Sequence, residues 1–169
     1  MNRAVLWAIL ILVTTVSTLA QNRSLPKFAD YRAAVEKPRV RSIDFKKNRD
    51  ANSFRTRLSS GLRGGVNFAG HYVVVGWGCG TGCISGAIID ARTGNVLWPE
   101  QLNGIGVYYA GDSYADEPVA FRKYSRLLTI TGSPGVRTGE PEKQAGIYYY
   151  EWKRDRLHLL RFVKKDVVE

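Results

Sequence analysis

The chain is poor in the residues that usually bind metals or carry out thiol chemistry. Among 169 residues there are two cysteines, Cys79 and Cys83, and two histidines, His71 and His158. These four side chains would barely complete one metal coordination shell, so a catalytic centre that needs several His or Cys ligands is excluded. The composition also lacks the low hydrophobic and high charged content of disordered chains, since 44% of the residues are hydrophobic and 24% are charged. A chain of this length normally forms one domain.

Long hydrophobic runs are missing after the N-terminal segment. Arg3 precedes an unbroken apolar run at residues 4–13, and small residues follow it up to Ala20. This order is typical of a secretory signal peptide, and the run is about half the roughly 20 residues that span a bilayer. No cysteine lies beside the cleavage position, so lipid attachment is not indicated. We predict a signal peptide at residues 1–20, a periplasmic or secreted protein, and no transmembrane segment in the mature chain.

The positive charge is concentrated in one part of the chain. The whole sequence has a net charge of +10, and residues 37–63 alone contain nine basic and two acidic residues, a net charge of +7. Residues 64–169 have a net charge of only +1. Such a surface is expected either to face an anionic envelope polymer or an acidic envelope protein, or to be a solvated face without a partner. Nucleic acid is not expected, because the basic residues are not interleaved with stacking aromatics.

Two short helices are predicted in the N-terminal part, after an extended lead at residues 21–27. The first is predicted at residues 28–37, before Pro38, and the second at residues 50–62, before several glycines. The apolar residues at helical spacing are Phe28, Tyr31 and Val35 in the first helix and Phe54, Leu58 and Leu62 in the second. Both would belong to a single β-rich domain at residues 28–169.

After Gly65 the hydrophobic pattern changes from helical spacing to alternation. Short segments rich in β-branched and aromatic residues are separated by Gly, Asp or Pro turns, as in antiparallel β proteins. The predicted strands are residues 71–77, 85–90, 95–98, 106–109, 119–122, 126–132, 146–152 and 157–163. The expected fold is α+β but mainly β, an antiparallel meander or small sandwich of about seven or eight strands with two short N-terminal helices.

The two cysteines lie in the densest glycine cluster of the chain. In an exported protein a pair of cysteines indicates a disulfide. A fully extended C-x-x-x-C segment would hold the two Cα atoms about 13 Å apart, beyond the reach of a disulfide, so Gly80, Thr81 and Gly82 must turn the chain back. We predict a Cys79–Cys83 disulfide that fixes the shape of this loop.

Other interpretations of the same segment are a thiol-dependent enzyme, a redox protein and a metal site. In a thiol-dependent enzyme, Cys79 or Cys83 would be the nucleophile and His71 its base. The sequence does not indicate an Asn or Asp that would orient the histidine as the third member of a catalytic triad. A redox role would use an exchangeable disulfide, although the C-x-x-C spacing is missing. A metal site would add His158 to these ligands, in competition with oxidation of the thiolates. The glycines match neither of the phosphate-binding motifs G-x-x-x-x-G-K-[ST] and G-x-G-x-x-G, so no cofactor is predicted.

Two segments, FAGHY at residues 68–72 and WGCGTGC at residues 77–83, resemble a group of small exported bacterial proteins with no assigned activity. The resemblance spans residues 54–160 and implies a bacterial envelope location and a β-rich domain. It supplies no catalytic residues. We therefore expect a binding or interaction protein of the cell envelope, without catalytic or metal-binding residues. Its candidate binding surface lies around the Cys79–Cys83 disulfide and consists of His71, Trp77, Gly80, Thr81 and Gly82.

Overall fold

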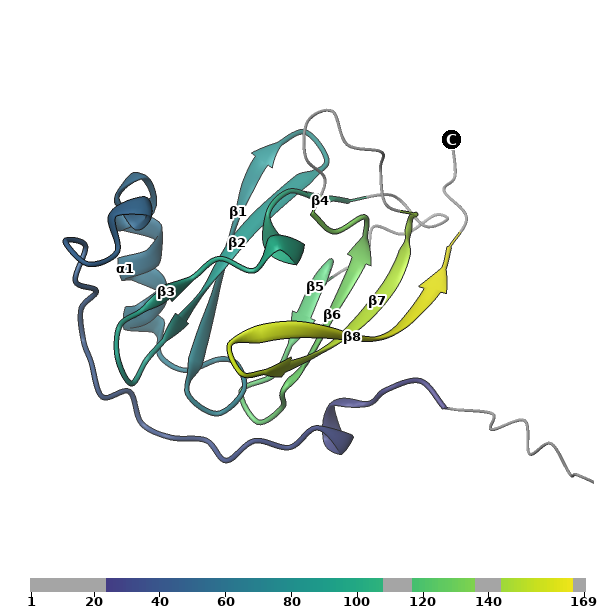
Figure 1. The fold of residues 1–169 in the computed structure, drawn as a ribbon, viewed down its shortest axis with the longest axis horizontal. Helices are drawn as coiled ribbons and strands as arrows, with labels where there is room; N and C mark the ends of the chain where they lie inside the picture. Colours follow the sequence, from purple (N-terminus) through teal and green to yellow (C-terminus); the bar gives the residue numbers. More distant parts are fainter. Residues whose placement is uncertain (1–23, 108–116, 136–143, 166–169) are drawn as a thin grey trace, which may run out of the picture.

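The computed structural model describes residues 24–107, 117–135 and 144–165, and these ranges form a layered β structure (Figure 1). Its helical elements are η1 (Phe28–Asp30), η2 (Arg49–Phe54), α1 (Arg55–Gly64) and η3 (Glu100–Leu102). Its strands are β1 (Tyr72–Gly80), β2 (Cys83–Asp90), β3 (Val96–Leu97), β4 (Ile105–Gly106), β5 (Val119–Phe121), β6 (Leu127–Gly132), β7 (Gly146–Lys153) and β8 (Arg156–Lys164). Each predicted strand overlaps one of these strands, so the mainly β prediction is confirmed.

The strands form two antiparallel sheets of four strands each. In the first sheet β1, β2 and β3 are neighbours in chain order, and β4 also pairs with β2. In the second sheet the order is β5-β6-β7-β8. Every strand pair is antiparallel, as the short connections require.

The first sheet is the middle layer, with helix α1 on one side and the second sheet on the other (Figure 1). Val73 and Val75 of β1 pack with Leu58 and Leu62 of α1, whereas Val74 packs with residues of the second sheet. Because side chains alternate across a strand, both faces of β1 are covered. This arrangement is a small sandwich with a helix on its outer face.

The prediction of a helix at residues 28–37 is wrong. Only the single turn η1 forms, and Val35 remains 50% exposed, so the helical spacing does not produce a buried face. The chain instead runs along the ends of both sheets (Figure 1), where Ala33 N–H donates to Tyr124 O and Glu36 N–H donates to Gly70 O, both at 2.8 Å. These bonds to loop residues at the ends of the strands replace the hydrogen bonds of a helix. The second helix is confirmed and consists of η2 followed by α1.

Two of the short connections between strands are tight hairpin turns. Asp90 accepts a hydrogen bond from Arg92 N–H at 2.8 Å and closes the connection between β2 and β3. Arg154 and Asp155 form the two-residue connection between β7 and β8. The predicted signal peptide lies outside the described residues. In the part of the chain that the structure describes, no helix is long and apolar enough to cross a membrane.

Candidate functional site

The disulfide predicted from the sequence is present and closes the end of the β1–β2 hairpin. Cys79 and Cys83 are bonded, with their Cα atoms 5.1 Å apart. A bulge between Gly78 and Gly80 lets Thr81 and Gly82 form the turn. Gly80 and Gly82 have φ angles of 145° and 64°, a region that favours glycine. The short G-x-G stretch between the cysteines therefore supplies the reversal that the disulfide needs.

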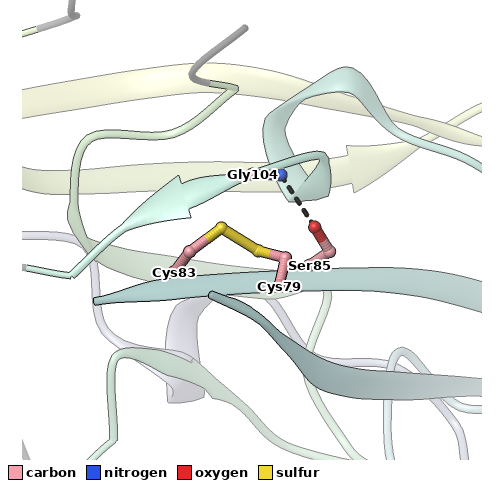
Figure 2. Close-up of a disulfide and its surroundings, with 4 residues drawn as sticks. All are labelled: Cys79, Cys83, Ser85 and Gly104. Atoms are coloured by element: carbon pink, nitrogen blue, oxygen red, sulfur yellow. Dashed lines mark hydrogen bonds between the residues drawn. A yellow bond between two sulfur atoms is a disulfide. The ribbon is translucent and has the colours of Figure 1, made fainter. Parts of the chain in front are cut away.

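A hydrogen bond next to the disulfide fixes the neighbouring loop (Figure 2). The backbone N–H of Gly104 donates to the hydroxyl oxygen of Ser85 at 3.0 Å. Ser85 lies on β2, opposite Trp77 of β1, and Gly104 lies between η3 and β4. The hairpin and the loop that carries η3 are thus held together, and they form two walls of a groove.

This groove has a volume of about 760 Å³ and an aromatic floor. Phe54 of η2 is stacked on Trp77 of β1 with ring centroids 4.4 Å apart, and Trp98 contacts both rings at 5.5 and 6.1 Å. Trp77 is only 9% exposed, whereas Trp98 is 39% exposed. The stacked pair of Phe54 and Trp77 therefore supports Trp98, which remains accessible to a ligand.

Polar side chains surround the aromatic floor. Asp50, Ser53 and Arg57 line the groove from η2 and α1, and Glu100 and Asn103 line it from the loop that carries η3. The groove thus combines a stacking surface with donors and acceptors from two walls, a composition typical of small-ligand sites. Cys79 lines it as well, so the disulfide contributes to its shape.

The structure brings together only part of the predicted binding surface. Trp77 lines the groove, and Gly80, Thr81 and Gly82 lie exposed at the end of the hairpin next to it. His71 lies before the first residue of β1, roughly 25 Å along the strand from Cys79 at the spacing of an extended chain. The candidate surface therefore divides into a groove with an adjacent hairpin end and a separate histidine.

His71 belongs to a polar cluster at the opposite end of the hairpin. Its ring contacts the ring of Tyr72 at 4.1 Å between centroids, and its Nε2 lies 3.9 Å from Asp90 Oδ1. Burial and the nearby Arg92 guanidinium lower the pKa of His71 below its usual range, against the opposite effect of the carboxylates of Asp90 and Glu36. A neutral, partly buried imidazole is therefore favoured.

This arrangement bears on the enzymatic alternatives. Both sulfurs are in the disulfide, and His71 is far from either one, so it cannot act as their base in this state. His158 is exposed on β8, where its Nε2 lies 3.1 Å from Lys153 O. No group of three His, Cys, Asp or Glu residues within the described ranges could hold a metal ion.

Several groove residues were not anticipated from the sequence. The sequence pattern predicts Phe54 on the packing face of a helix and Trp98 at the end of a strand. The signal that could have found them is the placement of large aromatics where an element ends, at Phe54 before α1 and at Trp98 after β3. Their meeting with Trp77 depends on long-range packing, which local spacing does not encode.

Comparison with known proteins adds no assignment. The chain matches no protein-family model, and neither the curated proteins nor the solved structures contain a significant match.

Proposed function

We propose that this chain is an exported binding protein of the bacterial cell envelope, and that it binds through the groove between η2, the β1–β2 hairpin and the η3 loop. The observation that carries the proposal is the exposed Trp98, supported by Phe54 and Trp77 and surrounded by polar side chains. Aromatic side chains held rigidly in a concave site provide contact area at low entropic cost.

The disulfide supports this proposal as a structural element. It closes the hairpin beside the groove, and an oxidising compartment such as the periplasm or the exterior would maintain it. We also propose membership of the group of small exported bacterial proteins that share the FAGHY and WGCGTGC segments. The proposed partner is an envelope protein or an anionic envelope polymer.

Affinity capture with matched variants tests the binding role. The mature chain, immobilised at low salt, is expected to retain an envelope component, and Trp98→Ala is expected to lose it. Tyr124→Ala is the control, because Tyr124 is another exposed aromatic residue, 47% exposed, in the connection between β5 and β6. If Trp98→Ala retains the same components as the wild type, or if nothing is retained above background, the proposal is wrong.

Export is tested on protein isolated from the periplasm of a bacterial host. Intact mass is expected to show a mature chain that begins after Ala20, and alkylation without reductant is expected to find no free thiol. A chain that still begins at Met1, or two rapidly alkylated cysteines, would contradict the predicted export and the stable disulfide respectively.

A further inference from the structure

The segment η2 presents two adjacent rows of side chains, and each row lines a different hollow. In a 3-10 helix residues three apart lie above one another. Asp50 and Ser53 therefore share the row that faces the aromatic groove, whereas Arg49 and Asn52, continued by Arg55 at the start of α1, share the next row. This second row lines a separate hollow of about 820 Å³. One short helical segment thus separates an aromatic groove from a second, chemically different site.

The second hollow is cationic. Lys46, Arg49 and Arg55 line it, together with a single carboxylate, Asp44. That carboxylate already accepts a hydrogen bond from Lys46 N–H at 2.9 Å, so it closes its own turn. None of the three cations has a carboxylate within salt-bridge distance among the residues that the structure describes. Their charge is therefore available to an external anion.

One guanidinium in this hollow is held in place. Arg55 Nη2 donates to Asn52 Oδ1 at 2.7 Å, and the guanidinium lies over the ring of Phe45, 4.2 Å from its centroid. A preoriented guanidinium loses less entropy when it binds a carboxylate or phosphate than a free side chain does. The hollow therefore has one preoriented donor, Arg55, beside two further cations, Lys46 and Arg49.

The surrounding surface strengthens the field at this hollow. All nine basic residues of the segment 37–63 are exposed, and within the described ranges only Arg39 forms a salt bridge, with Glu36 at 3.6 Å. Clustered charge of one sign attracts an oppositely charged ligand and accelerates its association. Lys46, Arg49 and Arg55 of this basic segment line the hollow and Arg57 lines the aromatic groove, whereas Lys37, Arg41 and Arg63 line a different hollow.

We infer that the ligand is an anionic glycan, with sugar rings in the aromatic groove and its carboxylate or phosphate groups in the cationic hollow. This inference rests on the proposed function and specifies its ligand. The apolar face of a pyranose ring fits against Trp98, and its hydroxyls match the carboxylates of Asp50 and Glu100 and the amide of Asn103. In the groove itself these two carboxylates outnumber the one cation, Arg57, whereas three cations face one carboxylate in the hollow, so the anionic groups bind on the other side of η2.

Three soluble probes of similar length separate the two parts of the site. The first is a polyuronate oligosaccharide, which has rings and charges, the second is a neutral glucan oligosaccharide, and the third is inorganic polyphosphate. Binding to the mature protein is measured by calorimetry and by tryptophan fluorescence at low salt. The polyuronate is expected to bind most tightly, and its affinity should fall steeply as the salt concentration rises. A phosphorylated oligosaccharide, as a fourth probe, distinguishes the carboxylate source of charge from the phosphate source.

Variants on each side of η2 are expected to act on different probes. Trp98→Ala should lower the affinity for the polyuronate and for the neutral glucan by about tenfold and leave the affinity for polyphosphate unchanged. The double variant Arg49→Gln/Arg55→Gln should lower the affinity for polyuronate and for polyphosphate by about tenfold at low salt. Its affinity for the neutral glucan should be unchanged. The double variant Lys164→Gln/Lys165→Gln, which removes the same charge at the far end of β8, is the control and should bind like the wild type. Trp98→Leu, which keeps apolar packing, is the second groove variant if Trp98→Ala fails to fold.

The inference is overturned if polyphosphate binds more tightly than both anionic oligosaccharides, or if neither Trp98 variant affects polyuronate binding. It is also overturned if the control charge variant weakens binding as much as Arg49→Gln/Arg55→Gln. If no glycan binds while envelope capture still depends on Trp98, the ligand is a protein and the proposed binding function remains. The two failures are therefore distinguishable.

Discussion

At the scale of single residues, the turn between β7 and β8 holds two non-glycine residues in an unfavourable backbone conformation. Arg154 and Asp155 have φ angles of 52° and 56°, in the left-handed region that L-residues adopt at a cost. Asp155 has a compensating contact, because its Oδ1 accepts a hydrogen bond from Tyr72 Oη at 2.7 Å. Burial, together with this bond, raises the pKa of Tyr72 to about 12. The turn is thereby fixed to the first sheet, while Arg154 keeps its unfavourable conformation.

Arg154→Asn is therefore expected to stabilise the protein. Asn adopts positive φ more readily than Arg and is preferred at the first position of such two-residue turns. We expect the free energy of unfolding in urea to rise by about 0.5 to 1 kcal/mol. Arg156→Asn, on the adjacent strand β8, is the control and should be neutral or destabilising. An unchanged or lower stability of Arg154→Asn would contradict the strain argument.

The disulfide makes a second contribution at this scale. The ring that Cys79 and Cys83 close is short, and the loop-entropy relation gives about 2 kcal/mol for a loop of this size. The double variant Cys79→Ser/Cys83→Ser is expected to lose about that amount in urea unfolding. Reductant should lower the stability of the wild type toward that of the double variant and leave the variant unchanged. Equal stability of both proteins without reductant would show that the disulfide contributes nothing.

At the scale of elements, the strands are predictable from the sequence because their signal is local. Alternating apolar residues and turn residues such as Asp90 occur within each hairpin, so nearby residues specify both strand and register. The segment at residues 28–37 has helical spacing but pairs with distant loops, and this pairing decides its conformation. The aromatic groove has the same origin, since Phe54, Trp77 and Trp98 meet only after η2, β1 and β3 have packed.

The close contact between α1 and β1 predicts that a larger side chain at this contact destabilises the protein. A Cβ atom at Gly61 would lie 2.4 Å from Cγ2 of Val75, whereas a Cβ at Gly64 would have no neighbour within 4 Å. Gly61→Ala is expected to destabilise the protein by about 1 to 2 kcal/mol, because overpacking exceeds the gain in helix propensity. Gly64→Ala, in the same helix, is expected to be neutral or to stabilise by up to about 1 kcal/mol. Thermal unfolding of both variants checks the difference, and equal effects would mean that α1 does not approach β1 this closely.

At the scale of the whole molecule, one polar cluster connects parts that are distant in the sequence. Glu36 lies on the segment that runs along both sheets, His71 precedes β1, and Arg92 lies in the turn between β2 and β3. Arg92 binds Glu36 through two nitrogens, with Nε 3.0 Å from Oε2. This hydrogen-bonded contact lowers the pKa of Glu36, and burial beside Arg92 lowers the pKa of His71. The N-terminal segment is thus bound to the rest of the fold at a cluster that contains His71, whose neutral form is favoured.

Stability is therefore expected to decrease as the pH falls below neutral. The pKa of His71 is lower in the folded protein than its usual value of 6.5, so the unfolded chain takes up the proton first. The resulting loss of stability begins as the pH falls through about 6.5 and continues until His71 is protonated in the folded state as well. Urea midpoints of the wild type should decline from about pH 7.5 to about pH 5.5, and those of His71→Gln should decline less. His158→Gln, an exposed histidine variant on β8, should keep the wild-type decline. Equal slopes for the wild type and His71→Gln would mean that another group carries the pH dependence.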